Sequence, residues 1–145
     1  MGMGRFDSLL LLSFGGPENS DDVMPFLRNV TAGRGVPDER LAVVAEQYEL
    51  FGGKSPINEL NQQLLCALDE ELASRGHEMA TFWGNRNWHP FVTDTVADLK
   101  SLGHTSTVCL VTSAFSSYSG CRQYHEDLDR ARNEVPGAPT VERVR

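Results

Sequence analysis

Near its amino end the chain contains the stretch Ser8-Leu9-Leu10-Leu11-Leu12-Ser13, followed directly by the turn-forming sequence Phe14-Gly15-Gly16-Pro17. A short, continuous apolar run that ends at glycine and proline is typical of a strand buried on both faces. Strands of this kind lie inside parallel sheets that helices cover on both sides. The stretch therefore predicts the core strand of an α/β domain.

The rest of the chain alternates between strand and helix patterns. Three further strands are expected at Glu78–Trp83, Ser106–Thr112 and Pro139–Val144. Helices are expected around Asp22–Asn29 with Ser20 as a candidate cap, from Pro37 to Gly52, from Ser55 to Gly76, from Pro90 to Gly103, and over Gln123–Arg132. Helices between strands act as crossovers, so we predict a doubly wound parallel sheet flanked by helices, a Rossmann-like α/β unit.

The helix that starts at Ser55 has the clearest local signals. Ser55 is expected to cap it, with Pro56 at the first helical position. Its apolar residues recur at helical spacing and predict a buried stripe of Leu60, Leu64, Ala67, Leu68 and Leu72.

Composition narrows the class of protein. The chain has 145 residues, which suits one domain, and its net charge of -7 argues against nucleic acid as a partner. No apolar run is long enough for a transmembrane segment. Three scattered cysteines, Cys66, Cys109 and Cys121, suit a reducing compartment, so we expect the cytoplasm. No helix pattern follows the fourth strand, so we expect residues 1–145 to be one domain of a longer protein.

Three loops follow the first three predicted strands, and parallel strands place such loops at one edge of the sheet, where open α/β sheets bind ligands. The third loop is rich in hydroxyl groups and reads Thr112-Ser113-Ala114-Phe115-Ser116-Ser117-Tyr118-Ser119-Gly120-Cys121-Arg122. Aromatic residues gather at this edge: Phe14, Trp83, Trp88, Phe115 and Tyr118. Rings, hydroxyls and a cation suit a flat ligand with anionic edges. Alternatively, some of these rings pack the sheet edge against the helices.

Other kinds of site have weaker support. The turn Phe14-Gly15-Gly16-Pro17 lacks the glycine spacing of a dinucleotide site, which leaves a nucleotide-binding domain as a disfavoured alternative. The four histidines, His77, His89, His104 and His125, show no convincing zinc-ligand spacing, so no metal ligand is assigned.

The loops, taken in order, resemble the amino-terminal half of the ferrochelatase family. The resemblance rests on Leu-Leu-Ser-Phe-Gly-Gly-Pro-Glu from Leu11, Asp-Val-Met-Pro-Phe-Leu-Arg-Asn-Val from Asp22, Tyr-Glu-Leu-Phe-Gly-Gly-Lys-Ser-Pro-Ile-Asn from Tyr48, Trp-Gly-Asn-Arg-Asn-Trp-His-Pro-Phe from Trp83, and Thr-Ser-Ala-Phe-Ser-Ser-Tyr-Ser-Gly-Cys-Arg-Gln-Tyr from Thr112. It implies a chelatase-like fold of two similar halves with a porphyrin between them. It is closest to the bacterial type that uses coproporphyrin III, which is favoured over protoporphyrin IX.

The resemblance also implies porphyrin-binding residues: Ser55, Tyr124, Phe14 and Tyr48. From the residues alone, Ser55 also suits a plain helix cap, and Tyr124 and Tyr48 suit the core. Thr31 and Gln47 stand where some family members have arginines for the propionates, which leaves Arg34, Lys54 and Arg122 as candidate substitutes.

The implied function is insertion of ferrous iron into a porphyrin in haem biosynthesis, with iron and porphyrin as substrates and no required cofactor. An iron–sulfur cluster is left open. The family's histidine and glutamate that handle the pyrrole protons belong to the second half, so we expect this chain to be inactive alone, with its catalytic residues unknown. The alternative is a non-catalytic tetrapyrrole-binding module.

Overall fold

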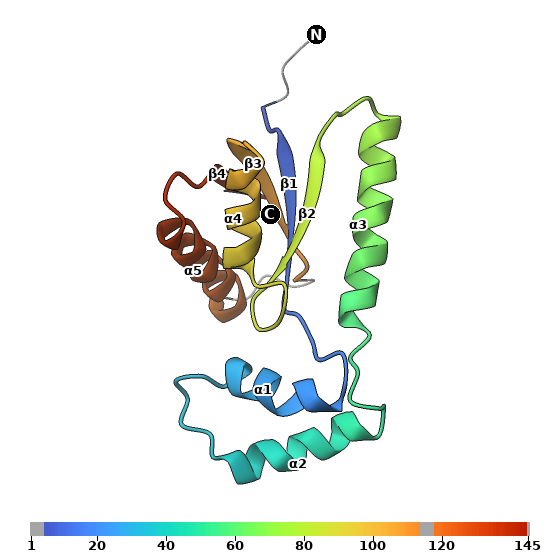
Figure 1. Ribbon diagram of the computed structural model, residues 1–145, viewed down its shortest axis with the longest axis vertical. Helices are drawn as coiled ribbons and strands as arrows, with labels where there is room; N and C mark the ends of the chain where they lie inside the picture. Colours follow the sequence, from blue (N-terminus) through green and yellow to red (C-terminus); the bar gives the residue numbers. More distant parts are fainter. Residues whose placement is uncertain (1–4, 114–117, 145) are drawn as a thin grey trace.

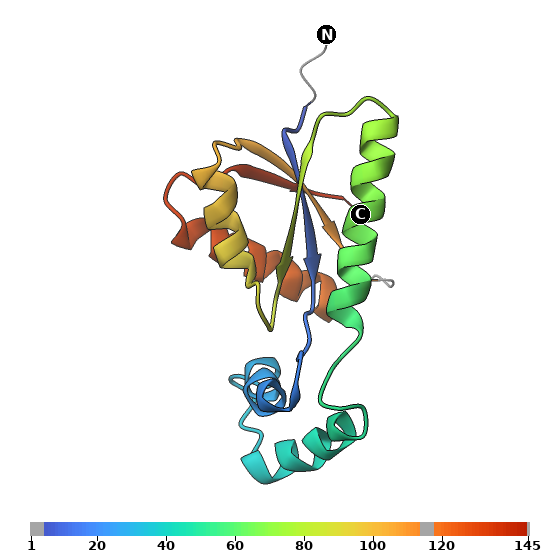
Figure 2. The same ribbon diagram turned by 45° about the vertical axis from the view of Figure 1, so that its right-hand side comes forward.

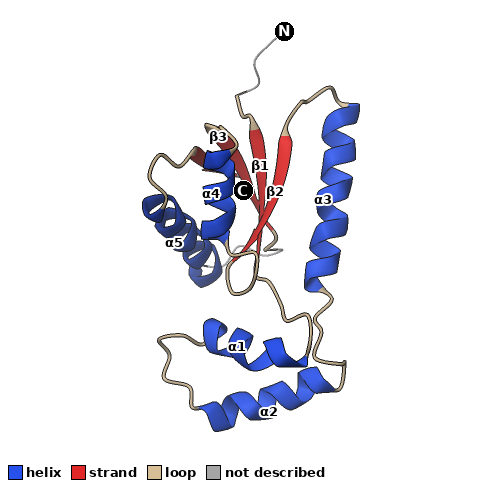
Figure 3. Cartoon of the chain, viewed as in Figure 1, coloured by secondary structure: helices blue, strands red, loops and turns tan. Residues whose placement is uncertain are grey.

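The structure is a computed structural model that describes residues 5–113 and 118–144. Figure 1 shows its elements, and Figure 3 separates the helices from the strands. In chain order they are β1 (Ser8–Ser13), α1 (Ser20–Val30), α2 (Asp38–Glu49), α3 (Ile57–Ser74), β2 (Ala80–Asn85), α4 (Val92–Ser101), β3 (Ser106–Val111), α5 (Tyr118–Glu134) and β4 (Thr140–Arg143).

The four strands form one parallel sheet in the order β2-β1-β3-β4, which confirms the predicted α/β fold. Leu10 of β1 lies opposite Phe82 on one side and Cys109 on the other, and β4 extends the sheet beyond β3. All six residues of β1 are buried, as the apolar run predicted. The strand is central because it has a partner on each edge and a helix layer on each face.

The two faces of the sheet are covered differently. Figures 1 and 2 show α4 and α5 on one face and α3 on the other, while α1 and α2 lie beyond the carboxyl ends of the strands. The face under α4 and α5 holds the main core, which includes Leu10, Leu12, Val96, Cys109 and Leu128. Burial raises the pKa of the Cys109 thiol to about 12, although Arg143 acts in the opposite direction, so this thiol stays protonated.

A second, smaller core joins α1 to α2. Val23, Phe26, Leu27 and Leu41 form its centre. The Asn19 side chain caps α1 by accepting hydrogen bonds from the backbone N–H groups of Asp21 and Asp22, so the prediction that Ser20 is the cap is wrong. Asn19 satisfies two of the four N–H groups that a helix start leaves without a partner.

Two other sequence predictions need correction. On α3, Leu60, Leu64 and Ala67 are exposed, and the residues buried against the sheet edge are the polar Asn58 and Asn61. The helix α5 begins at Tyr118, earlier than the predicted Gln123. The last residues of the hydroxyl-rich loop predicted at Thr112–Arg122 therefore belong to the helix. Within the described residues, no helix is both long and apolar enough to cross a membrane.

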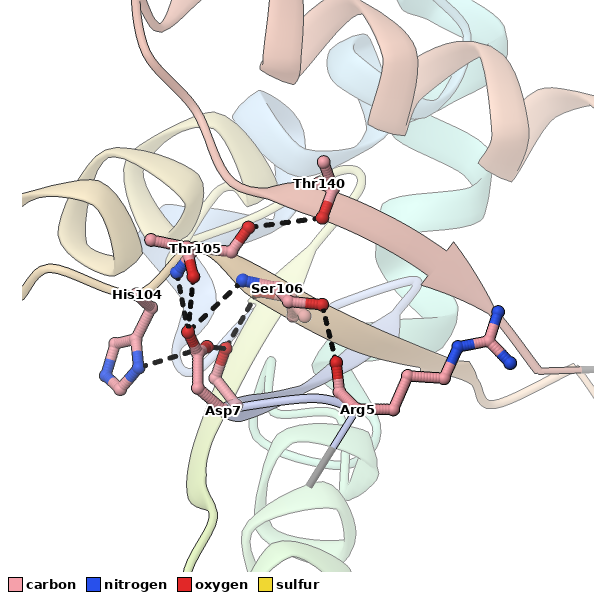
Figure 4. Close-up of polar contacts among 8 residues, drawn as sticks. Arg5, Asp7, His104, Thr105, Ser106 and Thr140 are labelled. Atoms are coloured by element: carbon pink, nitrogen blue, oxygen red, sulfur yellow. Dashed lines mark hydrogen bonds and ion pairs between the residues drawn. The ribbon is translucent and has the colours of Figure 1, made fainter. Parts of the chain in front are cut away.

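Asp7 joins β1 to β3 at the amino ends of the strands, on the side of the sheet opposite to α1 and α2. Its carboxylate accepts hydrogen bonds from the backbone N–H groups of Thr105 and Ser106 and from the Thr105 hydroxyl, and His104 Nδ1 lies 3.3 Å from it (Figure 4). The Ser8 hydroxyl also donates to Asp7. Burial opposes ionisation, but these hydrogen bonds outweigh it and hold the pKa of Asp7 at about 2, below its ordinary value of 3.8. Asp7 thus fastens the start of β1 to the start of β3.

We predict that Asp7→Asn lowers the free energy of unfolding at neutral pH by about 1 kcal/mol. This is less than hydrogen bonds to a fully buried carboxylate would contribute, because the Asp7 side chain is 38% exposed to solvent. Since the folded-state pKa is depressed, this stabilisation is complete above about pH 4 and is lost as the pH falls toward 2. Urea unfolding of both proteins between pH 7 and pH 2 measures the difference. Asp38→Asn, at the exposed Arg28–Asp38 pair, is the control and should have a smaller effect. A pH-independent difference for Asp7→Asn would contradict the prediction.

Candidate functional site

The loops that follow β1 and β2 are bonded to one another at the carboxyl edge of the sheet. The backbone N–H of Arg86 donates to Ser13 O over 2.9 Å, and that of Asn87 donates to Phe14 O over 3.0 Å. The third loop joins them where the Thr112 hydroxyl lies 3.0 Å from Ser13 Oγ. The predicted meeting of three loops at one edge is confirmed. Phe115, Ser116 and Ser117 lie outside the described residues, as does the side chain of Tyr118.

A cavity of about 780 Å³ opens between the end of α2 and the start of α3, next to the turn that follows β1. It is lined by Gln47, Tyr48, Phe51, Lys54, Ser55, Pro56 and Glu59. Its volume lies in the range of small-molecule sites, and it combines two aromatic rings with a few polar groups. Tyr48 and Ser55, both predicted to bind a porphyrin, therefore share one cavity.

The segment with Ser55 is held tightly against the turn after β1. The Ser55 backbone N–H donates to Pro17 O over 2.9 Å, and Asn58 Nδ2 donates to Gly16 O over 2.7 Å. A Cβ on Gly16 would lie 2.7 Å from both Ser55 Cβ and Ile57 Cγ2, so only glycine permits this approach. The Ser55 hydroxyl accepts from the Ile57 N–H at 3.4 Å, a long contact, and α3 has no side-chain cap of the predicted kind.

The position of Tyr48 depends on an aromatic cluster around Phe26. The Phe26 ring meets Phe14, Tyr48 and Trp88 edge-on, with ring centroids 6.1, 6.2 and 6.4 Å apart. Phe14 and Trp88 therefore pack the sheet edge against α1, as the alternative interpretation of these rings proposed. Phe14 does not line the cavity and supports it through Phe26.

Tyr124 lies elsewhere, in the main core between α5 and the sheet. It is 8% exposed, and the Arg86 guanidinium lies 5.8 Å from its ring centre. Burial is the main cause that raises the pKa of Tyr124; Arg86 opposes it and Asp127 adds to it. The structure thus brings Tyr48 and Ser55 together but places Tyr124 outside their cavity.

The three candidate cations are also separated. Lys54 lines the cavity with Tyr48 and Ser55, and its ammonium lies 3.9 Å from Glu18. Arg34 lines a second cleft of about 550 Å³ between α1, α4 and α5, and Arg122 pairs with Glu126 on α5. Of the three, Lys54 is the cation placed to meet a ligand in the cavity.

The sequence analysis missed the role of Arg86. Its Nε lies 2.5 Å from Asp127 Oδ2, and its Nη1 donates to Gln123 over 2.8 Å. The two charged side chains are only 20% and 13% exposed. Arg86 thus links the loop after β2 to the second and third turns of α5. No spacing in the sequence signals this pair, because its members are forty-one positions apart and come together only in the fold.

A comparison with known protein families shows to which family the chain belongs. The model of the family described as Ferrochelatase matches residues 7–145. The chain belongs to the ferrochelatase family. It is 58% identical over 138 residues to the coproporphyrin III ferrochelatase of Frankia alni, which covers 95% of this chain and 34% of the relative. It is 54% identical to the ferrochelatase of Rhodopirellula baltica and to the coproporphyrin III ferrochelatase of Nocardia farcinica, over 97% and 96% of this chain and 40% of each relative.

The chain therefore spans two fifths or less of the length of these ferrochelatases. Over residues 5–113 and 118–144, no three His, Cys, Asp or Glu side chains are grouped to hold a metal ion. Two of the histidines contact carboxylates away from the cavity: His104 lies beside Asp7, and His125 lies beside Asp129. His77 and His89 are exposed and do not line it.

We predict that Arg86→Met lowers the free energy of unfolding by about 3 kcal/mol, because it leaves Asp127 buried with only the more exposed Arg130 as a partner. Thermal and urea unfolding measure the loss. Arg75→Met, which removes the exposed Arg75–Glu71 pair of α3, is the control and should change stability by less than about 0.5 kcal/mol. Equal effects of the two substitutions would contradict the role of Arg86.

Proposed function

We propose that this chain supplies one wall of a ferrochelatase substrate site and acts in the insertion of ferrous iron into a porphyrin, with coproporphyrin III favoured over protoporphyrin IX. The observation that carries this proposal is the cavity that combines Tyr48, Ser55 and Lys54. The names of the family relatives support it, since two of those reported above are coproporphyrin III ferrochelatases. The scattered free cysteines favour the cytoplasm as its compartment.

The chemistry of the cavity fits a porphyrin edge. The rings of Tyr48 and Phe51 offer apolar, polarisable faces to a macrocycle, and Phe51 is 79% exposed, so its ring is accessible to a ligand. The Lys54 ammonium and the Ser55 hydroxyl are donors for a propionate carboxylate. A porphyrin with four propionates gains more from these donors than one with two.

We propose two roles for the four candidate porphyrin residues. Tyr48 and Ser55 contact the ligand directly. Phe14 supports Tyr48 through Phe26, and Tyr124 supports the site from the core, where it packs beside Arg86. A support role still alters affinity, but it acts through position and not through contact.

Iron insertion releases two pyrrole protons, which need an acceptor beside the ring nitrogens. Among the described residues that line the cavity, Glu59 is the one carboxylate, and it is exposed. We propose that the proton acceptor and the iron ligands come from the part of a ferrochelatase that this chain does not match. The chain alone would then bind porphyrin weakly but measurably and would not insert iron.

A nucleotide site at the glycine turn has no support from the geometry. Gly16 O accepts from Asn58, Pro17 O accepts from Ser55, and the space beside Gly16 is filled by Ser55 and Ile57. Pro17 has no N–H to donate, and Ser55 and Ile57 leave no room for phosphate oxygens beside Gly16.

We predict that coproporphyrin III added to the purified chain gives a saturable shift of the Soret band and quenches tryptophan emission, because Trp88 packs in the same aromatic cluster as Tyr48. Tyr48→Ala should weaken binding about tenfold, which corresponds to about 1.4 kcal/mol, and Ser55→Ala by a smaller factor. Gln63→Ala, on the exposed surface of α3, is the matched control and should bind like the wild type.

Two results would contradict the proposal. The first is a folded chain, checked by circular dichroism, that gives no shift with coproporphyrin III even when it is joined to the remainder of a relative. The second is equal loss of binding in Tyr48→Ala and Gln63→Ala. Binding without iron insertion, in the joined protein, would favour the alternative of a non-catalytic tetrapyrrole-binding module.

A further inference from the structure

Among residues 5–113 and 118–144, no helix lies over one half of the sheet face that carries α3. Figures 1 and 2 show α3 as the one described helix on its side of the sheet, and it contacts β2 and β1. The opposite face carries both α4 and α5. Parallel sheets are normally covered on both faces, because strands in them are apolar on both sides.

The side chains on this open half follow from the strand register. Leu10 and Cys109 lie in the core under α4 and α5, so the alternate residues Val108 and Leu110 of β3 project from the other face. Val144 continues this face next to β3, where its backbone N–H donates to Cys109 O over 2.8 Å. Val108 and Leu110 are only half-buried and Val144 is 47% exposed, whereas Leu9 and Leu11, nearer α3, are buried.

The flank of α3 that borders this half is apolar as well. Successive helix residues turn by about 100°, which puts Leu60, Leu64 and Ala67 on the flank opposite to Asp69. Asp69 accepts a hydrogen bond from Thr81 of β2, so its flank is the one nearer the edge strand. The other flank therefore faces β1 and β3, and it leaves Leu60 57% and Leu64 40% exposed.

Together these residues make a trough with an apolar wall and an apolar floor. The wall is the flank of α3, and the floor is Val108 and Leu110 of β3 with Val144 just beyond β4. On β4 this face carries the polar Thr140 and Glu142, and Glu142 forms an ion pair with Arg5 at the border of the floor. A trough beside a helix on a sheet fits one further helix, whose apolar stripe would cover the floor and pack along Leu60 and Leu64.

We propose that this trough docks an amphipathic helix that belongs to the part of a ferrochelatase not matched by this chain. The choice of occupant rests on the length of the relatives. The matched region is only 34% to 40% of the three relatives reported above, so most of a family-length protein remains to supply the helix. The docking covers apolar surface and needs no porphyrin, so it stands or falls separately from the proposed function.

The test compares this chain with a chimera in which it replaces the matched segment of the Frankia alni ferrochelatase. Leu64→Cys and Val144→Cys place a thiol on the wall and the floor of the trough, and Gln63→Cys places the control thiol on the outward surface of α3. Maleimide labelling is followed at each site by peptide mass spectrometry, without porphyrin. We expect all three thiols to react in the chain alone, and the first two to react at least about tenfold more slowly in the chimera while Gln63→Cys is unchanged.

Equal labelling of all three thiols in the folded chimera would overturn the proposal. Protection of Val144→Cys in the chain alone, rising with concentration and accompanied by a doubled mass, would also overturn it, because a second copy would then be the occupant. Hydroxyl-radical footprinting of Leu64 and Val144 in the unsubstituted chain and chimera gives the same comparison without any cysteine substitution.

Discussion

The structure depends on the burial of β1 along its whole length. A strand of four leucines must be covered on both faces and paired on both edges, and each neighbour takes its place accordingly. The serines at its two ends face polar partners. Ser8 Oγ lies 2.8 Å from the Thr107 hydroxyl, and Ser13 Oγ accepts from Asn61 over 2.7 Å. Polar groups at the ends of an apolar strand fix where the core stops and the loops begin.

The carboxyl end of β1 is also where the candidate site is organised. Ser13 joins α3 through Asn61 and the third loop through Thr112. Asn58, one helical turn earlier, holds the glycine turn that supports Ser55. The start of α3 thus buries two amides and not leucines, because these amides donate hydrogen bonds to a carbonyl of the turn after β1 and to a hydroxyl at the end of β1. The position of the cavity follows from these bonds, which tie the α2–α3 connection to the sheet.

The alternation of apolar runs and helical spacings sufficed to predict a parallel sheet, the order of helices and strands along the chain and the meeting of three loops. It failed where apolar residues at helical spacing were assumed to be buried, since Leu60 and Leu64 are exposed while Asn58 and Asn61 are buried. The spacing of apolar residues shows which of them share a helix face, but not which face of the helix packs against the sheet. Tyr48 and Ser55 were placed together by resemblance alone, and the Arg86–Asp127 pair had no local signal because its partners meet only through the tertiary fold.

The charge of the chain constrains how an anionic ligand can be held. A net charge of -7 gives long-range repulsion of a porphyrin with several carboxylates, but mobile ions screen this beyond about 8 Å at physiological salt. Inside that distance Lys54 is the cation of the cavity, and Glu18 and Glu59 lie close by. One partly neutralised cation cannot dominate affinity. In the proposed site, binding would therefore rest mainly on ring contact with Tyr48 and Phe51, and Lys54 and Ser55 would orient the carboxylate edge.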